Sequence, residues 1–247
     1  AAVDGVSANS LNNHFASIST DNGYTSPPCK ISASAKQRDT EYISEYSVFQ
    51  YLDKLKHTAT GLDGLPAWFL RLGAPVFCKP IARLFNLSLS TSTVPQQWKT
   101  ASIIPIPKVS QPKRHADFRP ISITPVLTRI MEKTIVRHFL YPALLSPPPS
   151  LSFSDQFAFR PAGSPAAAII TLLSLITNSL LTNPFVIVIS LDFSKAFDTV
   201  RHSTLLEKFA QLHIPDEAYN WLADYFRGHS HSTVYRDQTS TLKSINA

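Results

Sequence analysis

Residues 185–200 read FVIVISLDFSKAFDTV. The first seven, FVIVISL, form an uncharged and largely β-branched run directly before Asp192. The run predicts a buried strand over 185–191. Alternation along such a strand places Val188 and Ser190 on the same face as Asp192. A carboxylate at the end of a buried strand is costly without compensation, and a bound divalent cation would supply it. The alternative is that Asp192 caps a turn and accepts hydrogen bonds from the N–H groups that follow.

The composition indicates a globular protein with a mild basic bias. Of 247 residues, 44% are hydrophobic, and 23 Lys and Arg against 17 Asp and Glu give a formal net charge of +6. This length suits one large domain or two small ones. The charge fits a partner that carries phosphates, although many basic domains bind no nucleic acid. Cys29 and Cys78 have no CxxC spacing, which argues against structural zinc and a disulfide framework and suits a reducing, intracellular compartment.

Residues 166–191 contain no charged residue, a length that raises the question of a membrane span. Asn178, Asn183 and Pro184 divide the run, so we expect a buried helix followed by a buried strand, and no membrane partner. The N-terminus lacks the basic-then-apolar pattern of a signal peptide and begins with Ala rather than Met. We therefore expect a fragment or a processed product.

The remaining pattern alternates helical and extended segments, which indicates an α+β fold. Residues 1–44 are polar and aperiodic, and we expect a linker there with at most one short helix near 11–18. Periodicity and turn residues predict helices over 44–57, 67–90 with a break at 73–75, 125–139, 203–212 and 216–228, and extended segments over 103–108 and 118–123.

Four basic residues fall within twelve positions at and between the two extended segments: Lys108, Lys113, Arg114 and Arg119. Asp117 is the one acid among these positions. A charge run of this kind is usually a solvated face. Here apolar strands on both sides would fix the loop over a target. A triphosphate or a nucleic-acid backbone suits the planar fork of Arg and the point charge of Lys.

The run ISLDFSKAFDTV closely resembles motif A of reverse transcriptases from non-LTR (LINE-type) retrotransposons. The resemblance implies that Asp192 is a catalytic ligand of Mg²⁺, with Mn²⁺ as an alternative ion. It implies the backbone carbonyl of Phe193 as a second metal ligand. Phe197 matches the aromatic residue that closes against the sugar 2′ position and favours deoxynucleotides. We expect a structural role for Asp198, such as pairing with Arg201.

The two extended segments and the basic loop between them also resemble reverse transcriptases of this family. IPIPK, a variable basic loop and FRPISI resemble the fingers hairpin of these enzymes. The resemblance implies that Lys108 and Arg119 hold the phosphates of the incoming nucleotide. It assigns Lys113 and Arg114 only diffuse contacts with the template.

The segment SDQFAFRPAGSP resembles the Gln-x-Gly-Phe-Arg motif that precedes the palm. It implies nucleic-acid contacts for Gln156 and Arg160, with pairing of Arg160 to an internal acid as the alternative. Ala158 stands where the family has glycine. A Cβ at this position would hinder a positive φ or a close backbone approach.

Together these motifs cover about residues 45–240 and imply an incomplete right-hand polymerase fold, fingers plus the first part of the palm. The implied function is an RNA-directed DNA polymerase that joins dNTPs to a primer 3′ end by two-metal chemistry. Its partners would be an RNA template and a DNA primer or target, in the nucleus or a cytoplasmic ribonucleoprotein. The expected divisions are a linker over 1–44, the fingers and helical part over 45–184, and the start of the palm over 185–247.

No Asp-Asp pair occurs in the sequence, although the family places two further carboxylates in an aromatic-Ala-Asp-Asp hairpin after motif A. One aspartate cannot hold two ions. We therefore expect a chain truncated before that hairpin, inactive alone and in need of the missing C-terminal polymerase part. The alternative is a non-enzymatic retroelement relic with residual nucleic-acid binding. Asp224 is expected on a solvated helix face and Asp237 in a turn, so neither replaces the pair.

Overall fold

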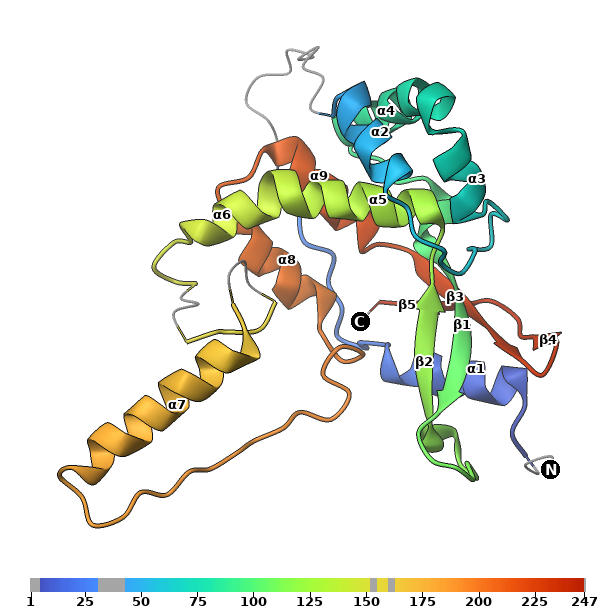
Figure 1. The fold of residues 1–247 in the computed structure, drawn as a ribbon. Coiled ribbons are helices and arrows are strands. Elements are labelled where there is room, and N and C mark those ends of the chain that lie inside the picture. Colours follow the sequence, from blue (N-terminus) through green and yellow to red (C-terminus); the bar gives the residue numbers. More distant parts are fainter. Residues whose placement is uncertain (1–4, 31–42, 152–154, 160–162, 247) are drawn as a thin grey trace.

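The computed structural model describes residues 5–30, 43–151, 155–159 and 163–246. It combines a helical part with a small mixed sheet, as an α+β fold requires (Figure 1). In chain order the helical elements are α1 (Ala8–Ile18), α2 (Glu45–Asp53), α3 (Ala67–Leu72), α4 (Ala74–Ser90), η1 (Gln96–Lys99), η2 (His115–Asp117), α5 (Val126–Ile135), the π turn η3 (Val136–Leu140), α6 (Tyr141–Leu145), α7 (Pro165–Leu180), α8 (His202–Ala210) and α9 (Asp216–Tyr225).

The sheet is organised around β1 (Thr100–Pro107), which confirms the first extended segment. It pairs antiparallel with β2 (Phe118–Ile123) and parallel with β3 (His229–Tyr235). β3 also pairs with β4 (Gln238–Thr239) and β5 (Lys243–Ile245). A parallel pair needs a long crossover connection, and here the helical region between β2 and β3 supplies it.

The helices α2, α3, α4, α5, α8 and α9 share the larger hydrophobic core. Its largest fully buried side chains include Trp221, Tyr219 and Phe85. Trp221 Nε1 donates to Ser88 Oγ at 2.9 Å, so the one polar atom of this ring is satisfied inside the core. The break predicted within 67–90 is confirmed at Gly73, which separates α3 from α4.

The N-terminal segment contains one short helix, as predicted, but this helix packs against the hairpin rather than lying in a loose linker. α1 starts at Ala8 rather than near residue 11, because the Ser7 hydroxyl accepts the N–H of Ser10 and caps the helix. Asn12 is 1% exposed, and its Oδ1 accepts from Thr233 Oγ1 at 2.8 Å. The buried face of α1 and the hairpin form a second small core of Leu11, Phe15, Ile103 and Phe118.

One carboxylate ties the start of β1 to the end of α9. Lys99 Nζ donates to Asp224 Oδ2 at 2.8 Å, and the N–H of Val94 donates to the same oxygen at 2.7 Å. The side chain of Lys99 is 7% exposed and that of Asp224 is 26% exposed. The prediction that Asp224 lies on a solvated face is wrong, because α9 turns this residue toward the chain that enters β1.

The predicted turn at Asp237 is confirmed. Arg236 and Asp237 have φ of 51° and 61° and connect β3 to β4. The helix predicted to end before Pro142 instead continues through η3 to Leu145. Pro142 is the second residue of α6, which follows the π turn η3 directly.

The uncharged run 166–191 differs most from its prediction. α7 forms, but none of its residues is buried, and it projects from the rest of the molecule (Figure 1). Residues 183–191 form no strand, and Ile187 and Ile189 are 75% and 77% exposed. A strand needs a neighbour for its backbone hydrogen bonds, and within the described residues this run has none. The predictions of a buried helix and a buried strand are therefore wrong.

No helix in the described ranges combines the length and the apolar character needed to cross a membrane.

Asp224→Ala is expected to lower the free energy of unfolding by about 3 kcal/mol, because it leaves the buried ammonium of Lys99 unpaired. Urea denaturation at neutral pH measures this change. The control Glu207→Ala, at an exposed position of α8, should change it by less than about 0.5 kcal/mol. Equal losses in the two variants would contradict the anchoring role of Asp224.

Stability should fall as the pH drops below about 6.5, because burial lowers the pKa of His229 to about 4. Between these values the unfolded chain binds a proton that the folded chain does not, so this stability is present above pH 6.5 and is lost toward pH 4. Burial lowers the pKa of His202 and His231 in the same direction, whereas it raises the pKa of Glu132, which opposes them.

His229→Gln isolates one contribution. The free energy of unfolding, measured by urea denaturation, should fall from pH 6.5 to pH 5. In His229→Gln this fall should be about 2 kcal/mol smaller than in the unsubstituted chain. The exposed His57→Gln should behave like the unsubstituted chain. An unchanged pH dependence in His229→Gln would argue against the buried neutral imidazole.

Candidate active site

The β1–β2 hairpin presents two of the predicted substrate-binding residues on one face. Ile106 lies opposite Arg119, and Pro107 lies opposite Phe118. Strand alternation then places Lys108 and Arg119 on the same side, while Phe118 points into the small core beneath α1. Lys108 and Arg119 are both exposed, so this face offers two cations to a ligand.

Asp117 organises the basic loop of the hairpin. Its Oδ2 accepts the N–H groups of Lys113 and Arg114, both at 2.9 Å, and these bonds hold the pKa of Asp117 below its usual value. Arg114 Nη2 also donates to Oδ1 at 3.3 Å. Lys108 Nζ donates to the carbonyl of Ala116 at 3.0 Å. The acid therefore closes the loop, and Lys113 and Arg114 stay on its exposed surface.

The motif-A segment forms an exposed turn after Asp192. The N–H of Asp198 and the hydroxyl of Thr199 both donate to the carbonyl of Lys195, at 2.9 Å and 3.1 Å. Asp192 is exposed, and Phe193 is 82% exposed. The segment therefore has a defined local turn but little cover from the rest of the chain.

The residues around Asp192 do not by themselves fit a magnesium site. In the part of the chain that the structure describes, no three His, Cys, Asp or Glu side chains gather closely enough to hold a metal ion. Asp192 and the carbonyl of Phe193 could supply two oxygen ligands, which leaves most positions of an octahedral ion to other groups. No second carboxylate of the described chain completes the set.

Asp198 is half-buried, as a structural residue would be, but its predicted pairing with Arg201 is wrong. The Arg201 guanidinium lies instead 3.9 Å from Asp21 Oδ2, and its side chain is 73% exposed, so this pair is weak. Asp198 lines a small cavity at the sheet together with Phe15, Ile18, Ser19, Ile103, Pro120, Ser122, His231 and Ile245.

The structure brings two of the motifs together. The rings of Phe159 and Phe197 meet edge to face, with centroids 6.0 Å apart. Gln156 is exposed, and its Nε2 donates to the carbonyl of Ala158 at 3.0 Å. The positive φ of this segment, 57°, falls on Phe159 rather than on the alanine that replaces the family glycine. Arg160 lies outside the described residues.

A basic cluster beside the hairpin was missed by sequence reasoning. The rings of His14 and His115 stack with centroids 5.6 Å apart. Burial, and then the charges of Lys195, His115 and Lys108, lower the pKa of His14. This places α1, the hairpin loop and the motif-A turn close together. The periodic pair Leu11 and Phe15 was the available signal that α1 packs.

Residues 106–244 match the family described as reverse transcriptase (RNA-dependent DNA polymerase), a span of more than half of the chain. The chain belongs to the reverse transcriptase family. The span contains β2, the turn after Asp192, β3 and β4; of β1 it includes only the last two residues, and it ends within β5.

Two curated relatives agree with this assignment. This reverse transcriptase chain is 27% identical over 190 residues to the RNA-directed DNA polymerase from mobile element jockey of Drosophila melanogaster. It is 26% identical over 178 residues to the retrovirus-related Pol polyprotein from type-1 retrotransposable element R2 of Nasonia vitripennis. The matches cover 76% and 71% of this chain but 20% and 16% of the relatives. The predicted kinship with retrotransposon reverse transcriptases of the LINE type is confirmed.

Proposed function

We propose that this chain supplies the fingers and the first part of the palm of an RNA-directed DNA polymerase from a non-LTR retrotransposon. Lys108 and Arg119 bind the triphosphate of the incoming deoxynucleotide. The proposal rests on the exposure of both side chains on one face of the β1–β2 hairpin. The Lys ammonium and the planar Arg guanidinium together suit adjacent phosphates.

Asp192 and the carbonyl of Phe193 contribute oxygen ligands to the magnesium site of the polymerase. The described residues supply no further carboxylate there, so the other ligands would be water, the phosphates of the nucleotide or carboxylates outside the described residues. Phe197 lies beside the sugar of the nucleotide. Its edge-to-face contact with Phe159 supports this role, since a neighbouring ring restricts the orientation of an otherwise exposed side chain.

Template and primer pass along the exposed polar surface of the same region. Lys113 and Arg114 contact the backbone of the RNA template from the hairpin loop, and their exposure supports this role. Gln156 contacts nucleic acid from the segment beside Phe197. The stacked His14 and His115 border this surface and add donors close to the hairpin loop.

Removing the two hairpin cations should weaken binding of a deoxynucleoside triphosphate. Each of Lys108→Gln and Arg119→Gln is expected to raise the Kd for dTTP with Mg²⁺ by about tenfold, since each removes a charge-assisted hydrogen bond to phosphate. Isothermal titration calorimetry measures the affinity. The exposed Lys79→Gln on α4 is the matched control and should leave the Kd within about twofold. Equal affinities in all variants would refute phosphate binding by the hairpin.

The 247-residue chain is expected not to extend a primer by itself. One aspartate cannot hold the two ions that align the attacking and leaving oxygens, and the sequence has no Asp-Asp pair. Primer extension on an RNA template with dNTPs and either Mg²⁺ or Mn²⁺ measures this. Robust templated synthesis that is lost in Asp192→Asn would show instead that the chain assembles a complete site.

A further inference from the structure

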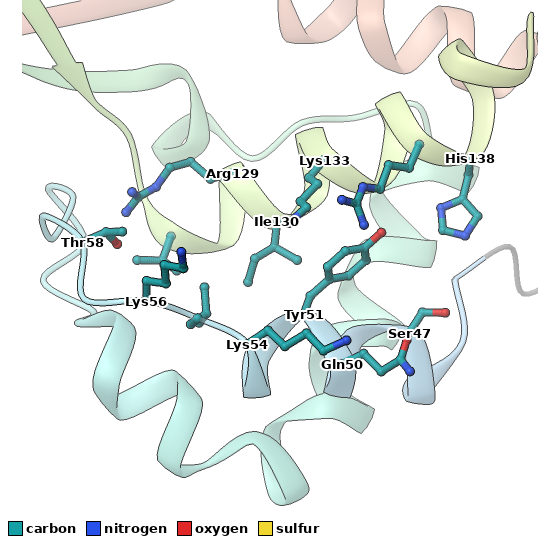
Figure 2. A pocket seen from close by; sticks show the side chains of 13 residues that line it. Ser47, Gln50, Tyr51, Lys54, Lys56, Thr58, Arg129, Ile130, Lys133 and His138 are labelled. Carbon is teal, nitrogen blue, oxygen red and sulfur yellow. The ribbon is translucent and has the colours of Figure 1, made fainter. Parts of the chain in front are cut away.

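A groove of about 710 Å³ lies between α2 and α5, and none of the candidate polymerase residues lines it. One wall comes from α2 and the chain that follows it, and the other comes from α5 and η3. Figure 2 shows Lys54 and Lys56 on the first wall and Arg129 and Lys133 on the second, with the ring of Tyr51 between the walls.

The groove is lined by cations and by no acid. Among the described residues, five Lys or Arg side chains border it, and His138 adds a sixth nitrogen group: Lys54, Lys56, Arg129, Lys133 and Arg137. None of these five forms an ion pair within that part of the chain. The acids on the two walls face elsewhere: Asp53 lines a different hollow, and Glu132 hydrogen-bonds to Tyr225. Arg129 interacts electrostatically with Glu132, so Lys54, Lys56, Lys133 and Arg137 supply most of the charge that can act on a ligand.

The cations of the second wall form a row. Arg129, Lys133 and Arg137 are four residues apart, so they follow one another at about 6 Å along the helix axis. The π turn η3 carries both Arg137 and His138 into the groove. A row of charges at regular spacing suits a ligand with repeated phosphates better than it suits one small anion.

The floor of the groove is aromatic and apolar. Lys133 Nζ lies 5.4 Å and the Arg137 guanidinium carbon 5.9 Å from the centroid of the Tyr51 ring, which holds both charged groups over this ring. Leu55, Val126 and Ile130 complete the lining around it. The ring thus positions two cations of a positively charged groove, and such grooves follow the backbone of single strands.

Arg129 adds an unsatisfied donor. Its Nη2 donates to the carbonyl of Ala59 at 2.9 Å, which fixes the guanidinium, but its Nε is buried and has no acceptor in the described chain. A buried N–H without a partner is unfavourable. Because Nε is buried, a ligand in the groove would meet this guanidinium at its terminal nitrogens.

We propose that the groove between α2 and α5 binds the sugar–phosphate backbone of a single-stranded nucleic acid, at a site separate from the hairpin. The proposal does not depend on polymerisation by this chain, because no residue of the groove belongs to the proposed polymerase site. RNA and DNA share the recognised backbone. The site therefore holds a strand through its phosphates.

The test uses the full chain and a fluorescein-labelled single-stranded RNA of twenty uridines, with binding followed by fluorescence anisotropy between 50 and 500 mM KCl. Lys133→Gln combined with Arg137→Gln should reduce the slope of log K against log salt by about 1.4. If the plots for this variant and the unsubstituted chain meet near 1 M salt, the variant binds about 25-fold more weakly at 0.1 M. Unchanged affinity and slope would overturn the proposal.

Two further double variants make the result specific. Lys79→Gln with Arg83→Gln removes the same charge at the same spacing from exposed positions of α4 outside the groove, and affinity should stay within about twofold. Lys54→Gln with Lys56→Gln, on the opposite wall, should weaken binding as the α5 pair does. Equal losses in the α4 and α5 variants would reduce the effect to net charge and refute a defined site.

Competition identifies the ligand. Unlabelled single-stranded DNA of the same length should displace the RNA at a comparable concentration, because the backbone is what the groove recognises. Polyglutamate or dTTP that displaced it equally well would refute a nucleic-acid strand as the ligand. A loss of RNA affinity in Lys108→Gln with Arg119→Gln, and none in the α5 variant, would assign the binding to the hairpin instead.

Discussion

The contact between Lys99 and Asp224 determines how the two halves of the chain meet. The carboxylate holds both the ammonium of Lys99 and the N–H of Val94, directly before β1 begins, and it lies at the end of the helix that leads into β3. Parallel strands begin at the same end of a sheet, so this contact brings Thr100 beside Ser230. Closing a connection of this length costs conformational entropy, which local contacts of either strand cannot recover.

The sheet fixed in this way carries the elements of the candidate site. β1 holds β2 in the hairpin that presents Lys108 and Arg119, and α1 packs beneath the hairpin through Phe15 and Phe118. Asn12 joins α1 to β3 by hydrogen bonds that a buried amide must make. The polar N-terminal segment thus supports the hairpin, although its composition suggested a linker.

Basic residues of the described chain gather on two surfaces. One is the hairpin with its loop, where Asp117 shapes the backbone but leaves the cations exposed. The other is the groove between α2 and α5, where no acid faces the ligand space of the described chain. Each surface suits phosphates, but the hairpin offers a pair of charges and the groove a row. This difference in geometry is the reason to assign a triphosphate to the first and a strand to the second.

The reverse transcriptase family and most helices and strands could be predicted from local sequence patterns. Several ordered motifs identified the family, and apolar periodicity located the hairpin, the break at Gly73 and the turn at Asp237. These features depend on local chemistry: which residues tolerate a strand, a helix or a turn.

Which side chains are buried, and which distant residues they contact, depends on the tertiary structure. An apolar run such as 185–191 shows what a segment can bury but not whether another segment covers it, and here it stays exposed. A helix period does not reveal which neighbour faces Asp224. The groove has the same origin, since α2 and α5 are far apart in the sequence and their cations share one hollow only after the helices pack. Such facts depend on contacts between distant residues, which no local pattern contains.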